Sequence, residues 1–179
     1  MIFKPGPHTP PEEWGESDIY EYEVERILIV QRDILVDLMV RNNQHAEHRM
    51  LVISETGHPA YMVPHVVRLL NERDDLTTFL LHDADAIGAG LKKRVKKLRW
   101  LPLKPHPVID MGFFPDDFTK LKHTRNYENR QRERTLPADA LMLGALVTGM
   151  SACFASHSTF AEELSREVEN SITSSSDFG

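Results

Sequence analysis

Cysteine, a secretory start and long apolar runs are scarce or missing in this chain of 179 residues. The single cysteine, Cys153, excludes a disulfide framework and favours a reducing compartment, so we expect a cytoplasmic protein. No basic and then apolar stretch precedes Pro5-Gly6-Pro7, and no secretory leader is therefore predicted. The most apolar uncharged stretch, residues 140–155, is short and holds two glycines, which favours a buried helix over a membrane span.

Motifs for nucleotide and zinc sites are incomplete. The Gly88-Ala89-Gly90 segment lacks the lysine and the following serine or threonine of a phosphate-binding loop. His45 and His48 lie three residues apart, but no neighbouring residues complete the three or four ligands that zinc needs. We therefore expect neither a Walker-type nucleotide site nor a zinc site.

The charge is unevenly distributed along the chain. A net charge of −6 argues at first against nucleic acid as a partner. Residues 92–134, however, carry 13 Lys and Arg against 5 Asp and Glu, a net charge of +8, whereas the rest of the chain carries 8 basic and 22 acidic residues. This asymmetry favours a surface that faces a polyanion. A solvated helix face would explain it equally well, and both interpretations stay open.

Apolar runs alternate with helix-like segments through much of the chain. Strands are predicted at 26–30, 50–54, 77–81 and, more weakly, 107–111. Helices are predicted at 33–43, 60–73 and 88–98, with a polar connection at 45–49. This order is typical of βαβ units and predicts an α/β fold, with a parallel sheet of about four strands flanked by helices.

Segments at both ends are predicted to lie outside the α/β domain, which spans residues 25–136. Residues 1–24 are expected to form an irregular acidic lead-in, because their first part holds four prolines. Residues 137–172 are predicted to form a helical segment, in which Thr159 and Glu162 make the capping box of a second helix. Residues 173–179 are expected to be a disordered tail.

Two aspartates follow the third predicted strand. In an extended segment residues i and i+2 point the same way, with Cα atoms about 6.5 Å apart, so Asp83 and Asp85 are expected to aim at one point beyond the strand. Open α/β sheets bind their ligands at this edge. Two close carboxylates repel each other unless a cation lies between them, which favours Mg²⁺ or Mn²⁺. A helix N-cap is the simpler alternative for an aspartate at this place.

Taken in order, these segments resemble a Toprim domain, most closely that of the A subunit of DNA topoisomerase VI and its meiotic double-strand-break relatives. The resemblance spans about residues 25–142 and is carried by Ile27–Asp33, Leu51–Pro59, Leu81–Gly88, Arg99–Leu101 with Gly112–Phe118, and Leu136–Asp139. It implies a Toprim fold, DNA as the substrate, and Mg²⁺ (or Mn²⁺) held by Asp83 and Asp85. It also implies a glutamate at the end of the first strand that assists proton transfer or metal binding.

The chain departs from this family pattern in two respects. Gln31 stands where the strand-end glutamate is expected, and an amide has no proton to exchange near neutral pH, so it cannot act as general acid or base. Glu55, at the end of the neighbouring strand, is the candidate substitute. The family also cleaves DNA with a tyrosine on a winged-helix domain ahead of the Toprim domain. Too few residues precede the first strand for that domain, so a protein partner is expected to supply the winged helix and the tyrosine.

Three functional hypotheses follow. In the first, the chain is an enzyme component that acts on DNA phosphodiesters with Mg²⁺. In the second, it is a catalytically degenerate scaffold or regulatory subunit, with a homodimer through residues 137–155 as one arrangement. In the third, it is a metal-dependent phosphoesterase of small substrates. The residues predicted to bind the DNA backbone are Lys92, Lys93, Lys96, Lys97 and Arg99.

Overall fold

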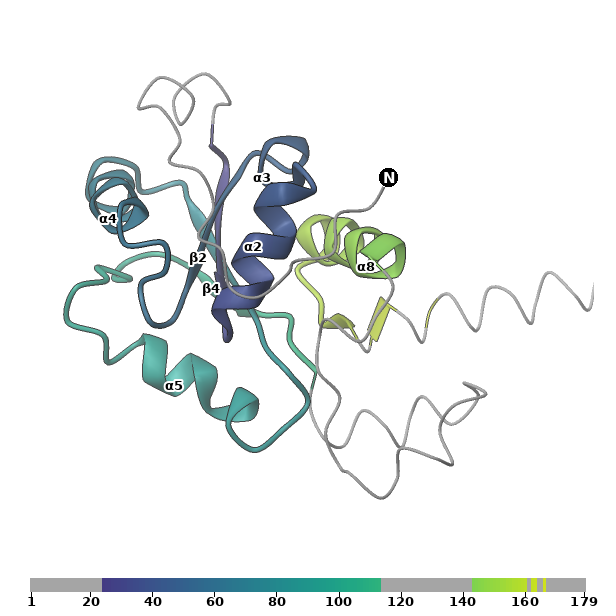
Figure 1. The fold of residues 1–179 in the computed structure, drawn as a ribbon. Helices are drawn as coiled ribbons and strands as arrows, with labels where there is room; N and C mark the ends of the chain where they lie inside the picture. Colours follow the sequence, from purple (N-terminus) through teal and green to yellow (C-terminus); the bar gives the residue numbers. More distant parts are fainter. Residues whose placement is uncertain (1–23, 114–142, 161, 164–165, 167–179) are drawn as a thin grey trace, which may run out of the picture.

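The computed structural model describes residues 24–113, 143–160, 162–163 and 166 (Figure 1). Within them the chain forms one parallel sheet with helices on both faces, which confirms the predicted α/β fold. The predicted tail at 173–179, nearly all of the lead-in at 1–24, the downstream basic residues 120–134 and the first residues of the 137–172 segment lie outside the described residues.

The sheet has four parallel strands in the order β2-β1-β3-β4. Their bounds are Arg26–Val30 for β1, Met50–Ser54 for β2, Thr77–Leu81 for β3 and Val108–Asp110 for β4. Val30 at the end of β1 lies opposite Ser54 of β2 and Leu81 of β3, so the three strands end in register. The first three strands are almost entirely buried, as expected for apolar runs covered on both faces.

The helices correct two details of the prediction. They are α2 (Asp33–Arg41), α3 (Gln44–Glu47), α4 (Met62–Glu72), the 3₁₀ turn η1 (Gly88–Gly90), α5 (Leu91–Val95) and α8 (Leu143–Ser156). The segment predicted as a polar connection holds the short helix α3, because Asn43 adopts a left-handed conformation (φ 58°) and the chain starts a new helical turn there. The predicted helix 88–98 is a 3₁₀ turn followed by only five α-helical residues.

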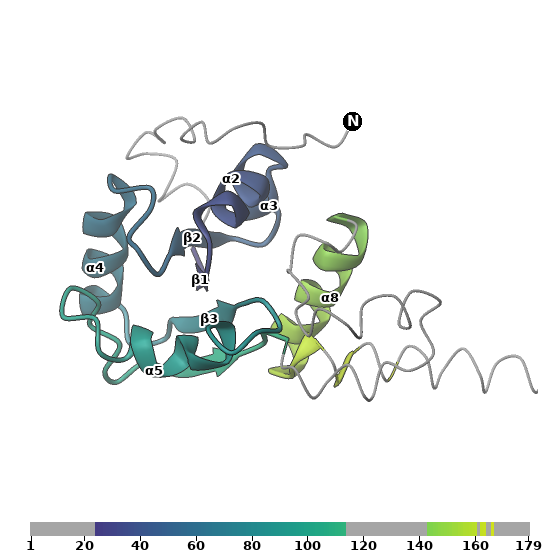
Figure 2. The same ribbon diagram turned by 60° about the horizontal axis from the view of Figure 1, so that its bottom comes forward.

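Two apolar cores cover the two faces of the sheet. Leu28 and Val30 of β1 belong to one core, together with residues of α2 and α8. Ile27 and Ile29 belong to the other core, together with residues of α4 and α5. This alternation is the period of two that a strand imposes on its side chains. In Figure 2, α4 and α5 lie to the left of and below the strands, whereas α2 and α8 lie above and to the right of them.

The strand order creates a switch point at the carboxyl edge of the sheet. From β1 the chain continues to β2 on one side, and from β2 it returns past β1 to β3 on the other. Such a reversal between adjacent strands is where open α/β sheets bind ligands. Hydrogen bonds continue the ladder here, from Gln31 N–H to the Leu81 carbonyl (3.0 Å) and from Glu55 N–H to the Val30 carbonyl (2.9 Å). Residues 31, 55 and 82–85 therefore share one edge.

The C-terminal part packs on the core that contains α2. The pKa of the Cys153 thiol is raised to about 12, mainly by burial, so the thiol stays protonated and serves as apolar packing. The predicted capping box is present: Thr159 N–H donates to Glu162 Oε2 (2.8 Å), and Glu162 N–H donates to Thr159 Oγ1 (3.3 Å). Among the described residues, no helix has the length and apolar character to cross a bilayer.

Candidate functional site

Gln31 directly follows β1 and holds the loop that follows β3. Its side-chain Oε1 accepts a hydrogen bond from the backbone N–H of Asp83 (2.8 Å). The amide group therefore fixes the position of the first aspartate. A carboxylate at residue 31 could accept the same bond, but only a carboxylate would also add a negative charge at this edge.

Asp83 is paired with an arginine from the neighbouring strand end. Arg32 Nε lies 2.8 Å from Asp83 Oδ2, and Arg32 Nη2 donates a hydrogen bond of 3.2 Å to Oδ1. The Asp83 side chain is 9% exposed and the Arg32 side chain 34% exposed. No sequence pattern singled out Arg32, although it directly follows Gln31. Both oxygens of the more buried aspartate are thus engaged by the chain's own guanidinium group.

Asp85 caps the turn that follows. Its Oδ1 accepts a hydrogen bond from Gly88 N–H, and its carbonyl oxygen accepts one from Ala89 N–H (3.0 Å). Strand β3 ends at Leu81, so residues 83 and 85 do not belong to an extended segment and the expected shared direction does not follow. The two carboxylates have different partners, and the capping role foreseen as the alternative accounts for Asp85.

Glu55, the candidate substitute for the missing glutamate, is held by Arg94 of α5. Arg94 Nε and Nη2 donate to its two carboxylate oxygens at 2.7 and 2.8 Å, a bidentate pair. Arg94 Nη1 also donates to the carbonyl of Ile87. These contacts tie α5 to the end of β2. They also place the basic helix beside the carboxyl edge of the sheet.

His82 is fully buried under the acidic loop. Its Nδ1 lies 2.8 Å from the Asp83 carbonyl oxygen, and its Nε2 lies 3.0 Å from Asp110 Oδ1 at the end of β4. Burial lowers the pKa of His82, but the contacts with Asp110 and with the Asp83 carbonyl outweigh burial and raise the pKa above its ordinary value. The ring needs the space left by two glycines, because a Cβ on Gly112 would lie 2.2 Å from the ring and one on Gly88 would lie 2.8 Å from it.

Exposed positive charge lies along and after α5. Leu91 and Val95 face the core, so the basic side chains between and after them point outward. The predicted DNA-binding residues are exposed at Lys93, Lys96, Lys97 and Arg99 and partly exposed at Lys92. The structure therefore gathers the predicted basic residues on one short, solvated segment next to the candidate site.

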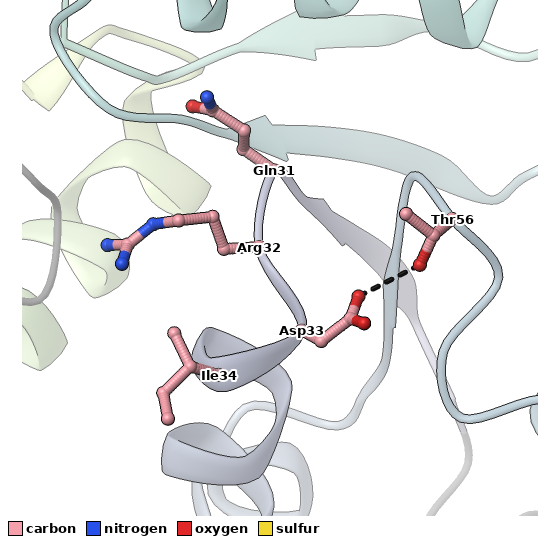
Figure 3. Close-up of a pocket in the computed structure, with 5 residues that line it drawn as sticks. All are labelled: Gln31, Arg32, Asp33, Ile34 and Thr56. Atoms are coloured by element: carbon pink, nitrogen blue, oxygen red, sulfur yellow. Dashed lines mark hydrogen bonds between the residues drawn. The ribbon is translucent and has the colours of Figure 1, made fainter. Parts of the chain in front are cut away.

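An open hollow of about 360 Å³ lies at the end of β1. It is lined by Gln31, Arg32, Asp33, Ile34 and Thr56. Figure 3 shows that the side chains of Gln31 and Arg32 leave the strand end on one side, whereas Asp33 turns toward Thr56, whose hydroxyl donates to it (2.9 Å). The hollow thus opens directly beside the arginine that holds Asp83.

The oxygen atoms at this edge, where the sequence resemblance implies a divalent cation, are already engaged by other groups of the chain. Asp83 is engaged by Arg32, Glu55 by Arg94, Asp85 by a backbone N–H, and the Gln31 oxygen by another. Within the described residues, no three His, Cys, Asp or Glu side chains gather in a way that could hold a metal ion. Mg²⁺ prefers six oxygen ligands at about 2.0–2.1 Å and carries charge that a guanidinium repels. The arrangement does not fit that ion, and metal binding by Asp83 and Asp85 stays a prediction.

Comparison with known proteins gives two matches. The sequence model of a family described as the Toprim domain of Spo11 and of the A subunit of topoisomerase 6 matches residues 26–136. The chain is also similar to "Meiotic recombination protein W68" of Drosophila melanogaster, with 26% identity over 125 residues, a segment that covers 60% of this chain and 38% of that relative. No solved structure matches significantly. The matched family segment contains β1 to β4 and every candidate site residue described above.

Proposed function

Because the chain belongs to the Toprim family of Spo11 and the topoisomerase 6 A chain, we propose that it is a DNA-binding Toprim domain that does not cleave DNA on its own. This family acts on DNA, and its Toprim domains generally bind a divalent metal. The aligned segment is well under half the length of its meiotic relative. The activity of a whole family member is therefore assigned to this chain only as part of the proposal.

The observation that carries the proposal is the exposed basic segment beside the carboxyl edge. Lys93 of α5 and Lys96, Lys97 and Arg99 after it are exposed there, and the Arg94–Glu55 pair fixes α5 to the sheet. Lysines on a solvated surface suit the phosphate backbone, which attracts them regardless of sequence. The proposed mode of binding is therefore electrostatic, salt-dependent and weakly selective.

The absence of independent cleavage is inferred from the chemistry at residue 31. A glutamate can hold and release a proton, whereas the Gln31 amide cannot, and losing a general acid or base typically costs about 10²–10⁴ in rate. Both carboxylate oxygens of the proposed substitute, Glu55, accept hydrogen bonds from Arg94. Tyr61 is the only tyrosine among the described residues, and it lies at the start of α4 and not in the acidic loop after β3.

Fluorescence anisotropy with a labelled DNA duplex in EDTA tests the binding. We expect affinity that falls steeply with salt and does not depend on sequence. The Lys93→Ala/Lys97→Ala variant should lower the slope of log K against log salt by about two, close to 0.9 for each phosphate contact. The matched control is Arg49→Ala/Arg68→Ala, which removes two exposed charges from other surfaces. Equal effects of the two variants, or no binding at low salt, would contradict the proposal.

The retained Asp83-x-Asp85-x-x-Gly88 sequence favours a second candidate function. In it, the domain holds Mg²⁺ and cleaves DNA once a protein partner brings a winged helix and a catalytic tyrosine. Nicking of supercoiled plasmid by the chain mixed with such a partner, lost in Asp83→Asn, would support this candidate. The first function predicts DNA binding without nicking in the same assay.

A further inference from the structure

The carboxylates at the carboxyl edge are neutralised by side chains of this chain. Asp83 is held by Arg32 through two contacts of 2.8 and 3.2 Å. Glu55 is held by Arg94 through two hydrogen bonds of 2.7 and 2.8 Å. The Arg94 pair has the bidentate geometry that makes arginine a strong partner for a carboxylate. Arg32 makes one hydrogen bond, through Nη2, and its Nε forms an ion pair with the other Asp83 oxygen.

Residue 31 decides how much positive charge this edge requires. A glutamate there would place a further carboxylate beside Asp83, because Gln31 Oε1 already lies 2.8 Å from the Asp83 backbone nitrogen. Two carboxylates this close need more than one positive charge to remain ionised together. With the neutral amide, one guanidinium balances the single buried charge of Asp83. The substitution at residue 31 and the Arg32–Asp83 pair are thus electrostatically matched.

We propose that Arg32 takes the place of the divalent cation in this Toprim domain. The Arg32 side chain neutralises Asp83 from the end of β1 and blocks a metal from both oxygens of that carboxylate. Arg94 likewise engages Glu55, so the two carboxylates are not available together as metal ligands. The acidic edge keeps the Asp83-x-Asp85-x-x-Gly88 sequence but carries fixed arginine charges. This inference deepens the proposed function, because DNA would be bound without metal, and it rests on the assignment to the Toprim family.

The position of Arg32 supports this role over that of an ordinary surface ion pair. The Asp83 side chain is only 9% exposed, and the backbone N–H of Asp83 is held by Gln31, so both the carboxylate and the loop that carries it are anchored at the strand ends. The guanidinium itself borders the open hollow at the end of β1 (Figure 3). Arg32 therefore lines an opening at this edge in addition to holding Asp83.

Titration calorimetry with Mn²⁺ alone, in the absence of DNA, tests the inference. The wild-type chain should show no saturable site tighter than about 1 mM. The Gln31→Glu/Arg32→Ala variant restores a carboxylate and removes the guanidinium, and it should gain one site at least about tenfold tighter than that limit. Gln31→Glu/Arg32→Lys keeps a cation in place and should not gain the site. Arg94→Ala frees Glu55 but leaves Arg32 on Asp83; it is the single-variant control and should not gain the site.

Each outcome bears on the inference. One Mn²⁺ site in the wild-type chain that disappears in Asp83→Asn would overturn it. A Gln31→Glu/Arg32→Ala variant that folds, by circular dichroism and a cooperative urea transition, but gains no site would overturn it as well. The titration of the wild-type chain tests the inference even if that variant does not fold. Failure of the proposed function would show separately, as loss of DNA binding in EDTA with the metal titrations unchanged.

Discussion

Positive charge is used in opposite ways at two places on the carboxyl edge: its centre, around Asp83 and Glu55, and its flank, along and after α5. At the centre, Arg32 and Arg94 turn inward, and each engages both oxygens of a carboxylate. At the flank, Lys93 and Lys97 of the α5 segment are exposed to solvent. An arginine fork suits a fixed carboxylate, whereas a lysine is a mobile point charge that suits a phosphate backbone. The comparison indicates that one edge combines a self-neutralised acidic centre with a basic surface that remains available to a polyanion.

The largest expected effect comes from filling the space under the acidic centre. A Cβ on Gly88 would lie 2.1 Å from the Asp83 carbonyl oxygen and 2.9 Å from Gln31 Oε1, so Gly88→Ala must move the loop. We expect the free energy of unfolding to fall by about 3 kcal/mol. Gly90→Ala is the control, because its Cβ meets no backbone atom and only one side-chain atom, Arg94 Nη1 at 2.9 Å, and it should cost less than about 1 kcal/mol. Urea denaturation measures both, and equal costs would contradict the packing described for Gly88.

Breaking the central ion pair should have a smaller effect on stability. Arg32→Ala leaves the mostly buried Asp83 without its guanidinium, and we expect the free energy of unfolding to fall by about 2 kcal/mol, between the values for buried and surface pairs. Arg68→Ala, which removes the exposed pair with Glu72 on α4, is the comparison for a surface ion pair. A double-mutant cycle of Arg32→Ala with Asp83→Asn should give a coupling energy of about 1 kcal/mol or more. Coupling near zero would show that the pair contributes nothing.

Removing charge from the flank should change binding and leave stability unaltered. Lys93→Ala/Lys97→Ala is expected to weaken DNA binding about tenfold at moderate salt, or about 1.4 kcal/mol, with the free energy of unfolding changed by less than about 0.5 kcal/mol. Anisotropy and urea denaturation on the same preparation separate the two effects. If stability fell with affinity, the flank would be part of the folded core and the contrast with the centre would be lost.

The smallest effect is a pH dependence in which two histidines act in opposite directions. The raised pKa of His82 adds stability that is present below about pH 6.5 and is lost as the pH rises through the folded-state pKa. Burial lowers the pKa of His45 to about 4, so His45 removes stability as the pH falls from about 6.5 toward 4. Urea denaturation at a series of pH values should show His82→Asn flattening the neutral part of the profile and His45→Gln flattening the acidic part. Identical profiles for both variants would contradict these assignments.

The fold was predictable from the sequence because its strands are short, continuous apolar runs. The first three strands begin and end at the predicted residues, since β-branched and leucine residues buried on both faces leave little choice of structure. The region near residues 44–47 and the length of α5 were predicted wrongly. Both depend on local turns, such as the left-handed Asn43, that have no strong periodic signal.

The sequence predicted a candidate site at this edge, and that site stays a prediction; the contacts within it were not predicted. The acidic loop and the departure at Gln31 were recognised from motif order and strand ends. The Arg32–Asp83 and Arg94–Glu55 pairs join residues 51 and 39 positions apart, and no sequence pattern specifies which arginine reaches which acid. His82 and Asp110 were likewise brought together by the pairing of β3 with β4. Spacing along the chain identified the acids, whereas their neutralisation depends on the packed edge.

The most direct test of the self-neutralised centre is an anomalous difference map from crystals of the wild-type chain grown with MnCl₂. The account predicts no manganese peak within coordination distance of Asp83 or Asp85, with the Arg32 guanidinium still against the Asp83 carboxylate. A manganese peak that bridges the two aspartates, with Arg32 displaced from Asp83, would contradict it.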